Sequence, residues 1–311
     1  MKSPILEVES LCKQYHSTIA LNNISFSLEK GEILSLIGPN GAGKTSLIKI
    51  IAGISKPNSG SVRTSANDQA KSIWQIIGYC PQQNVFWPNL NCLEQVMIMA
   101  KMYSVQVTDI EAHCKSILSD LGLGNKLMSK AITLSHGMQK RLSIALSIVH
   151  SPSILILDEP SAGLDPYSRR FLRDFLNKLH TEKMVTIIVS THELTEADVF
   201  STKVAIMNQG KLLKFGKANE LKASLGGRFV LEIPNLPELN HLSDAFSKYK
   251  NQSSSSYNDK HVFYYEDLDS LIHSDIFKLE NISNGEIPYT VRPVSLEDVF
   301  YSFVKEDQAD Y

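Results

Sequence analysis

The chain has 311 residues, enough for one large domain or, as we expect, one domain with a smaller one attached. Its 31 basic and 33 acidic residues give a formal net charge of -2, so no overall basic field favours nucleic acid or an anionic membrane surface. The sequence shows no signal-like N-terminal run and no uninterrupted apolar run of about 18 residues. We therefore expect a cytoplasmic chain that reaches a membrane only through a partner.

Four cysteines, Cys12, Cys80, Cys92 and Cys114, are spread through the first half of the chain without any C-x-x-C spacing. That spacing does not favour a structural metal site. We expect four reduced thiols, in keeping with a cytosolic protein.

A phosphate-binding motif, G-x-x-x-x-G-K-[ST], occurs in full between a run of buried-strand character, residues 33–37, and a segment of helical spacing. Its glycines let successive backbone N–H groups point inward at an anion that the following helix also attracts, and Lys44 neutralises the outer phosphates. Thr45 offers a hydroxyl to Mg²⁺. The residues expected to hold the nucleotide here are Gly38, Pro39, Asn40, Gly41, Ala42, Gly43, Lys44, Thr45 and Ser46.

Two segments before this motif, residues 6–9 and 24–28, alternate apolar and polar side chains. This period predicts two half-solvated, antiparallel strands. Tyr15 lies between them at a strand end, where its ring is placed to stack on an adenine. An edge-strand aromatic without a ligand is the alternative, since tyrosine favours strands anyway.

Three later strands are predicted at residues 76–80, 154–157 and 185–190, with a helical pattern from Pro88 to Pro152 inserted between the first two. The second strand ends in Asp158-Glu159 and the third is followed by His192. Ligand groups project from the carboxyl ends of strands in a doubly wound sheet. Asp158 is therefore expected beside Thr45, at the Mg²⁺ position.

The C-terminal part changes character near Gly226, after a hairpin at residues 204–215 that turns at Asn208-Gln209-Gly210. We predict strands at 228–233 and 261–265, a helix around 239–246, a flexible loop at 253–256 and a final helix capped by Ser295. This pattern indicates a small α+β appendage, for which dimerisation and regulation are the two hypotheses.

Further motifs indicate which class of nucleotide-binding protein the chain resembles. Residues 134–142, Leu-Ser-His-Gly-Met-Gln-Lys-Arg-Leu, resemble the signature motif of the ATP-binding cassette (ABC) family. Glu159 to Asp165 resemble that family's Walker B extension and D-loop, while Gln82 and His192 fall at its Q-loop and switch histidine. The resemblance covers residues 5 to about 225, with six motifs in the family's order.

The resemblance implies an α/β fold: a P-loop NTPase (RecA-like) core with an N-terminal antiparallel β subdomain and a helical insertion subdomain at about 88–152. These would form an ABC ATPase domain over residues 1–225, followed by a small C-terminal α+β accessory domain over 226–311. It also implies ATP hydrolysis with Mg²⁺ as cofactor. A GTPase would want an N-K-x-D base reader, but Asn125-Lys126 is followed by Leu127-Met128.

Carried over by position, the resemblance makes Glu159 the base that polarises the attacking water, with Asp158 holding Mg²⁺ through water. Gln82 would ligate Mg²⁺ and sense the γ-phosphate, and His192 would hydrogen-bond that phosphate and orient the water. A purely structural role is the alternative for each, since a lone histidine at a strand end is more often structural than functional.

Ser135 and Gly137 would complete the ATP site of an opposite subunit across a head-to-tail interface. One P-loop and one signature then imply a homodimer or a pair with a related cassette. The signature departs from L-S-G-G-Q, because His136 replaces the first glycine and Met138 replaces the glutamine. Because His136 carries a side chain where the family has glycine, two possibilities stay open. The two cassettes could close more slowly, or this chain could be the less active member of an asymmetric pair.

Residues 84–93 would receive a helix from an integral membrane permease, and residues 84–86 and 294–300 resemble export-type cassettes with separately encoded permeases. The expected function is thus the ATPase subunit of an exporter on the cytoplasmic face of a membrane, without nucleic acid as partner. Two alternatives stay open: a soluble ABC ATPase acting on nucleic acid or ribosomes, and a weakly hydrolysing regulatory cassette. The transported substrate would be set by the permease.

Overall fold

The computed structural model describes residues 4–65, 72–235, 254–257, 260–278, 282 and 287–309. The chain divides into two compact units. Unit 1 comprises Met1–Glu193 and Val199–Phe215, and unit 2 comprises Leu194–Asp198 and Gly216–Tyr311.

A three-stranded antiparallel sheet in the order β2-β1-β4 begins unit 1. Its strands are β1 (Leu6–Tyr15), β2 (Thr18–Leu28) and β4 (Ser59–Thr64). Leu6 lies opposite Leu28, and Leu6 and Val8 are buried while Glu7 between them is only partly so. The predicted antiparallel pairing and its alternation are confirmed.

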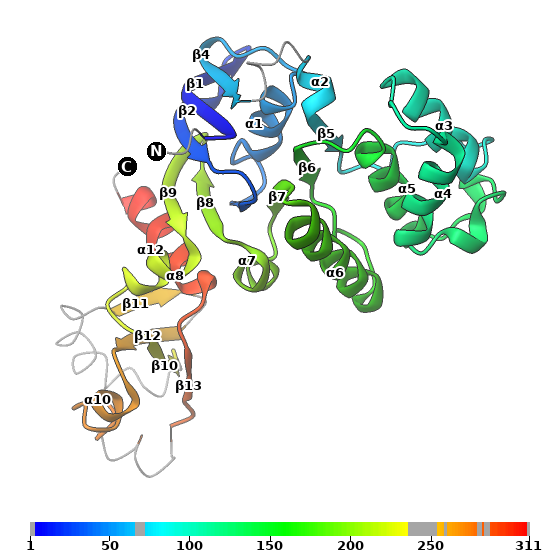
Figure 1. The fold of residues 1–311 in the computed structure, drawn as a ribbon. Coiled ribbons are helices and arrows are strands. Elements are labelled where there is room, and N and C mark those ends of the chain that lie inside the picture. The colour runs from blue at the N-terminus through cyan, green and yellow to red at the C-terminus, as the bar shows by residue number, and fades with distance from the viewer. Residues whose placement is uncertain are drawn as a thin grey trace. The chain divides into compact units, whose positions relative to one another are not determined.

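A second sheet, in the order β5-β6-β7-β3-β8-β9, carries the rest of unit 1 (Figure 1). Its strands are β3 (Ile33–Ile37), β5 (Ile77–Cys80), β6 (Ile154–Asp158), β7 (Thr186–Thr191), β8 (Lys203–Asn208) and β9 (Lys211–Lys217). The strands β5, β6, β7, β3 and β8 run parallel. Every residue of β3, β6 and β7 is buried, as expected for a parallel sheet covered on both faces.

The carboxyl ends of β3, β6 and β7 meet at one edge of this sheet, because the three strands are adjacent and parallel. Helix α1 (Lys44–Ile51) follows β3, α6 (Pro166–Lys183) follows β6, and α7 (Leu194–Phe200) follows β7. The predicted P-loop NTPase core is therefore confirmed.

The start of β5 differs from the prediction, since this strand begins at Ile77 rather than Ile76. Residues Ile73–Ile76 form the short helix α2. Ser72 and Gln75 exchange side-chain to backbone hydrogen bonds in a capping box. Such a box satisfies two backbone N–H groups at once and favours a helical turn over a longer strand.

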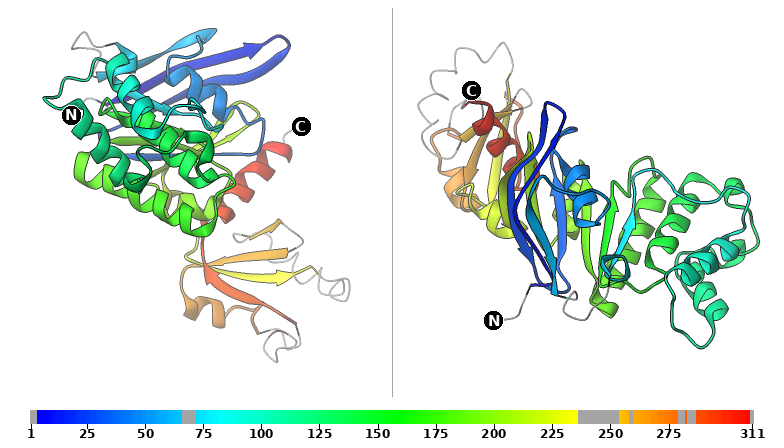
Figure 2. Two further views of the ribbon diagram at one scale, coloured as in Figure 1. Left: turned by 90° about the vertical axis from the view of Figure 1, so that its right-hand side faces the viewer. Right: turned by 90° about the horizontal axis from the view of Figure 1, so that it is seen from above.

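The helical region between β5 and β6 contains α3 (Cys92–Met102), α4 (Ile110–Asp120) and α5 (His136–Ile148). Asn91 caps α3 and forms a capping box with Glu94. Figure 2 shows α3 and α4 standing away from the sheet. Their inward faces share one apolar cluster with the α6 side of the sheet, including Val96, Leu118 and Leu176.

Unit 2 contains a four-stranded sheet in the order β11-β12-β10-β13. Its elements are α8 (Ala218–Ala223), β10 (Phe229–Pro234), β11 (Ser254–Tyr257), β12 (Lys260–Tyr265), α10 (Leu268–Ile272), β13 (Thr290–Pro293) and α12 (Leu296–Ala309). The predicted loop at 253–256 is wrong where β11 pairs with β12, because ladder hydrogen bonds use the backbone and tolerate polar side chains. The helix predicted around 239–246 lies outside the described residues.

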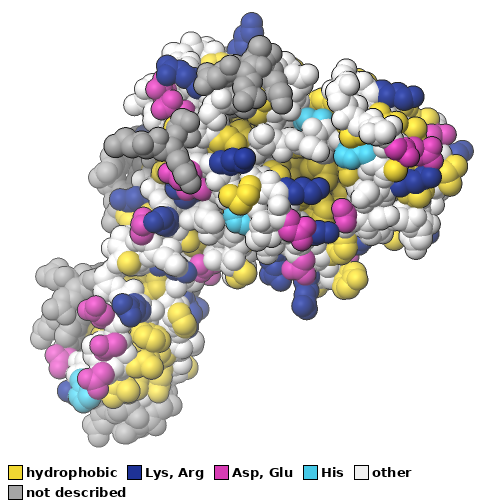
Figure 3. All heavy atoms as spheres, viewed as in Figure 1, with side chains coloured by type: hydrophobic (Ala, Val, Ile, Leu, Met, Phe, Trp, Pro, Cys, Tyr) yellow, Lys and Arg dark blue, Asp and Glu magenta, His cyan; other side chains and the backbone are white. Residues whose placement is uncertain are grey.

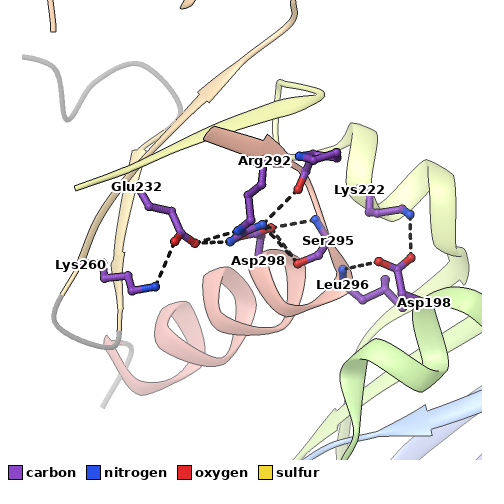
Figure 4. A network of polar contacts seen from close by, with 9 residues as sticks. Asp198, Lys222, Glu232, Lys260, Arg292, Ser295, Leu296 and Asp298 are labelled. Atoms are coloured by element: carbon purple, nitrogen blue, oxygen red, sulfur yellow. Dashed lines mark hydrogen bonds and ion pairs between the residues drawn. The ribbon is translucent and has the colours of Figure 1, made fainter. Parts of the chain in front are cut away.

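A polar network inside unit 2 joins β10, β12, β13 and the start of α12 (Figure 4). The Arg292 guanidinium donates to Glu232 Oε1 at 2.8 Å and to both Asp298 oxygens at 2.7 Å. Asp298 is fully buried and also accepts the backbone N–H of Ser295 at 2.8 Å. Ser295 directly precedes α12. The hydrogen bonds to Asp298 and Glu232 raise the pKa of Arg292 further above its ordinary value, against the effect of burial.

The same network extends to α7. Asp198 accepts from Lys222 Nζ at 2.7 Å and from the backbone N–H of Leu296 at 3.3 Å (Figure 4). A carboxylate at a helix N-terminus is favourable because it meets unpaired N–H groups and the positive end of the helix dipole. The segment that directly follows His192 and Glu193 in the chain is thus anchored on unit 2's last helix.

We predict that Arg292→Ala destabilises unit 2 by about 3–5 kcal/mol, because it leaves the buried Asp298 carboxylate without its counter-charge. Urea unfolding followed by a probe in unit 2 checks this, with Lys115→Ala as control, since Lys115 makes only an exposed pair with Glu111. An unchanged unfolding midpoint in Arg292→Ala would contradict the role assigned to the network.

Candidate functional site

The P-loop holds its lysine inside the loop. Lys44 is 6% exposed, and its Nζ donates to the carbonyl oxygens of Gly38 at 2.6 Å and Pro39 at 3.0 Å. Burial lowers the pKa of Lys44, while the charges of Glu159 and Asp158 oppose that shift. A cation is therefore preformed at the centre of the loop, beside the two carboxylates.

Two glycines of the loop are required by space, and Gly43 also by its conformation. A Cβ at Gly38 would lie 2.3 Å from the Met207 carbonyl oxygen, and one at Gly43, whose φ is +100°, would lie 2.4 Å from that of Ala20. Neither approach is possible for another residue without a backbone shift. The motif therefore fixes a bare backbone curl, which is the shape that a polyphosphate needs.

Thr45 and Asp158 come together as predicted. Thr45 Oγ1 donates to Asp158 Oδ1 at 3.4 Å, and Asp158 is 2% exposed at the end of β6. A hydroxyl and a carboxylate are hard oxygen donors of the kind that Mg²⁺ prefers. This donor set, next to the Lys44 cradle, fits a magnesium-bound nucleotide.

Glu159 meets Gln82 and His192 at the same edge of the sheet. Gln82 Nε2 donates to Glu159 Oε2 at 3.0 Å, and His192 Nδ1 lies 3.6 Å from Glu159 Oε1. The Glu159 side chain is 14% exposed and that of His192 is 55% exposed. The three residues follow the ends of β5, β6 and β7, so adjacent parallel strands bring them together.

Tyr15 ends β1 beside the P-loop. Its side chain hydrogen-bonds to those of Ser55 and Ser46, and Lys13 Nζ lies 4.9 Å from the ring centre. Burial opposes the shift, but these bonds and the Lys13 charge lower the pKa of Tyr15 overall. The ring is 43% exposed, so part of its surface remains accessible to a planar base.

The signature residues lie at the N-terminus of α5. Ser135 caps this helix by accepting the Met138 N–H at 3.4 Å. A Cβ at Gly137 would lie 2.8 Å from Ser168 Oγ, and His136 Nε2 is 3.5 Å from the Cβ position of Gly163. Within the part of the chain that the structure describes, no hydrogen bond joins Ser135 to the P-loop.

Two residues that the sequence did not suggest tie these parts together. Lys140 on α5 is 3% exposed and donates to the backbone oxygens of Pro81 at 2.9 Å and Gln82 at 3.2 Å. Ser190 on β7 accepts the Glu159 N–H at 2.9 Å. The sequence could have pointed to Ser190, because it follows the apolar residues Ile187, Ile188 and Val189 and lies two residues before His192.

An apolar hollow of about 420 Å³ opens next to Gln82, between the sheet and the helical region. We call it the aromatic hollow; its lining includes Val85, Phe86, Trp87, Met99, Tyr103 and Leu146. Val85 and Trp87 are 60% and 41% exposed. Burial, with a smaller effect of Asp158, raises the pKa of Tyr79 in its wall to about 12, so this phenol stays neutral.

The chain is similar in sequence to known ATP-binding cassettes. Residues 21–162 match the family model described as ABC transporter. The linearmycin resistance ATP-binding protein LnrL of Bacillus subtilis is 32% identical, over 74% of this chain and 74% of that protein. The chain belongs to the ABC transporter family. It is an ATPase cassette of that family, with the P-loop nucleotide site described above.

Larger relatives and solved structures agree with this membership. Human ATP-binding cassette sub-family A member 10 is 31% identical over 99% of this chain, which spans only 21% of that protein. A solved ATP-binding subunit of an ABC transporter is 28% identical, with a TM-score of 0.65, over 71% of this chain and 93% of its own. The ATP-binding cassette MJ0796, solved as a dimer in a post-hydrolysis state with ADP and Pi, is 25% identical with a TM-score of 0.62, over 68% and 98%.

No helix among the described residues has both the length and the apolar character needed to cross a bilayer.

Replacing Glu159 by glutamine tests the proposed base at this site. The amide keeps the shape but cannot accept a proton, so we expect steady-state phosphate release to fall by about 10²–10⁴-fold. Binding of a fluorescent ATP analogue should stay unchanged. Glu193→Gln is the matched control, because Glu193 pairs with Arg169 at 2.8 Å instead. Wild-type turnover in Glu159→Gln would rule out the assignment.

Proposed function

We propose that the chain binds and hydrolyses Mg·ATP as one half of a head-to-tail cassette dimer that drives an export permease. The main support for this proposal is that the P-loop and the signature serine lie apart within one chain. The P-loop, Asp158, Glu159, Gln82 and His192 gather at one sheet edge. The signature serine at the start of α5 is exposed and makes no hydrogen bond to that P-loop among the described residues.

At the sheet edge, Lys44 would neutralise the outer phosphates while the bare backbone of the loop donates to them. Thr45 and Gln82 would ligate Mg²⁺ directly and Asp158 through water; when bound, this ion neutralises charge on the transferred phosphoryl group. Glu159 would take a proton from the attacking water. His192, half exposed beside it, would hydrogen-bond the γ-phosphate.

The partner subunit's signature would close each site. Ser135 and the N–H groups at the start of α5 form a surface suited to an anion. Gly137 lets the start of α5 approach Ser168 closely, whereas His136 adds a side chain next to the turn at Gly163. A homodimer or a pair with a related cassette satisfies this requirement equally, and the dimeric structure of the MJ0796 cassette supports such pairing.

The aromatic hollow is the surface that we assign to the permease. It is apolar, exposed and connected to the catalytic residues, because the backbone of Gln82 and of the hollow's wall is held by Lys140 and Ser143. A hydrophobic helix seated there would therefore press on the segment that carries Gln82. The resistance role named for LnrL supports export by analogy. In that function the chain would work on the cytoplasmic face of a membrane.

The soluble alternative, acting on nucleic acid or ribosomes, finds little support in the surface. Basic and acidic side chains are interspersed over the face that Figure 3 shows, and the formal net charge is -2. A protein that binds a polyanion usually presents a basic stripe or patch.

Affinity capture from detergent-solubilised native membranes with Mg·ATP tests the permease. We expect a multi-span protein in stoichiometric amount, and at least about tenfold less of it with Val85→Asp, which places a charge in the hollow. Met128→Asp is the control, since Met128 is 75% exposed but does not line the hollow. Recovery of only soluble proteins, ribosomes or nucleic acid would overturn the export function and favour the soluble ATPase.

A further inference from the structure

The end of β7 places one hydroxyl between the two acidic residues of the site. Every residue of β7 is buried, and Ser190 is 0% exposed. Three apolar residues, Ile187, Ile188 and Val189, precede it in the strand, and Thr191 follows it. Burying a hydroxyl costs free energy unless the group is hydrogen-bonded, so Ser190 needs partners.

Those partners are the two residues on which the proposed chemistry depends. Ser190 Oγ donates to Asp158 Oδ1 at 2.5 Å and accepts the backbone N–H of Glu159 at 2.9 Å. The direction is fixed, because an ionised carboxylate can only accept and an amide N–H can only donate. The Ser190 carbonyl oxygen accepts the same N–H at 3.2 Å.

The first bond sets the orientation of the carboxylate. Asp158 Oδ1 receives both the Ser190 hydroxyl and the Thr45 hydroxyl, the latter at 3.4 Å. The Ser190 bond is short, as expected for a charged acceptor, whereas the Thr45 contact is long, so Ser190 is the main donor that orients this carboxylate. Neither of these two bonds uses the other oxygen, Oδ2, which we assign to a metal-bound water.

The second bond supports an unusual backbone. Glu159 has a φ of +43°, in the left-handed region that non-glycine residues rarely adopt. Such a conformation persists only when surrounding contacts impose it. Ser190 supplies two of these contacts, and they aim the Glu159 side chain at Gln82 and His192.

We propose that Ser190 is a positioning residue for ATP hydrolysis, locking the metal-holding Asp158, the base Glu159 and the nearby His192 into one rigid group. It acts through Asp158 and Glu159, which its hydroxyl contacts. This inference rests on the proposed function, since it assigns a role in the same reaction. A hydroxyl that merely satisfies its own burial would affect stability, whereas a positioning hydroxyl also affects turnover and the response to Mg²⁺.

Ser190→Ala tests the proposal in the full chain. Because groups that orient metal ligands typically contribute 10–100-fold to affinity or activity, we expect kcat to fall by about 10–100-fold and half-saturation by Mg²⁺ to rise severalfold. The KM for ATP should change by less than about twofold, since the P-loop is untouched. Ser190→Thr, which keeps the hydroxyl and suits a strand, should restore both quantities.

A buried serine on the adjacent strand provides the matched control. Ser35 on β3 is 1% exposed and its Oγ pairs with Ser201 Oγ at 2.5 Å, away from the carboxylates. Ser35→Ala removes an equally buried hydroxyl, and we expect wild-type kcat and Mg²⁺ dependence from it. If Ser35→Ala shows the same defect as Ser190→Ala, the effect is general loss of packing and the proposal is wrong.

A readout without turnover completes the test. The extra thermal stabilisation that Mg²⁺ adds to the ADP-bound chain should shrink in Ser190→Ala and return in Ser190→Thr. If Ser190→Ala does not fold, Ser190→Cys takes its place, because a thiol keeps the volume but is a weak donor. Wild-type kcat and Mg²⁺ response in the folded variant would overturn this proposal, whereas absent turnover in the wild type would instead overturn the proposed function.

Discussion

The parallel pairing of β6, β7 and β3 is the constraint on which the site depends. Strands that run the same way end at the same edge, so the P-loop after β3, the acidic pair after β6 and the histidine after β7 must meet there. Their distance in the sequence is irrelevant to this geometry. The full burial of these strands fixes their register. That register sets where the segments carrying Lys44, Asp158 and His192 leave the sheet.

Under the proposed function, a site fixed in this way is completed by the signature of a second chain. The helix that carries Ser135 and Gly137 is held to the Q-loop by Lys140, so the signature of one chain and the sensor Gln82 are mechanically connected. The aromatic hollow adjoins the same segment. In the proposed function, this short stretch after β5 would link the permease, the nucleotide and the opposite subunit.

Sequence alone predicted the P-loop, the parallel core and the position of Asp158 beside Thr45, because these follow from motif chemistry and strand order. The place of Glu159, Gln82 and His192 in the site was implied by the family resemblance. The sequence did not predict Ser190 or the Arg292 network, since hydrogen bonds between distant segments leave no local period. The positive φ of Glu159 was also hidden, because nothing in the residue type indicates a left-handed backbone. The loop assigned to polar residues 253–256 failed because backbone pairing outweighed side-chain polarity.

The most direct test of the central claim, a catalytic site shared between two chains, mixes two inactive variants. Lys44→Ala removes the phosphate cation, and Ser135→Glu sets a negative charge at the signature; each alone should be inactive. Mixed dimers contain one intact site, so we predict that mixing restores about a quarter of wild-type turnover at equal amounts. Activity no greater than the sum of the separate variants would show that two copies of this chain do not share a site, and would contradict the account.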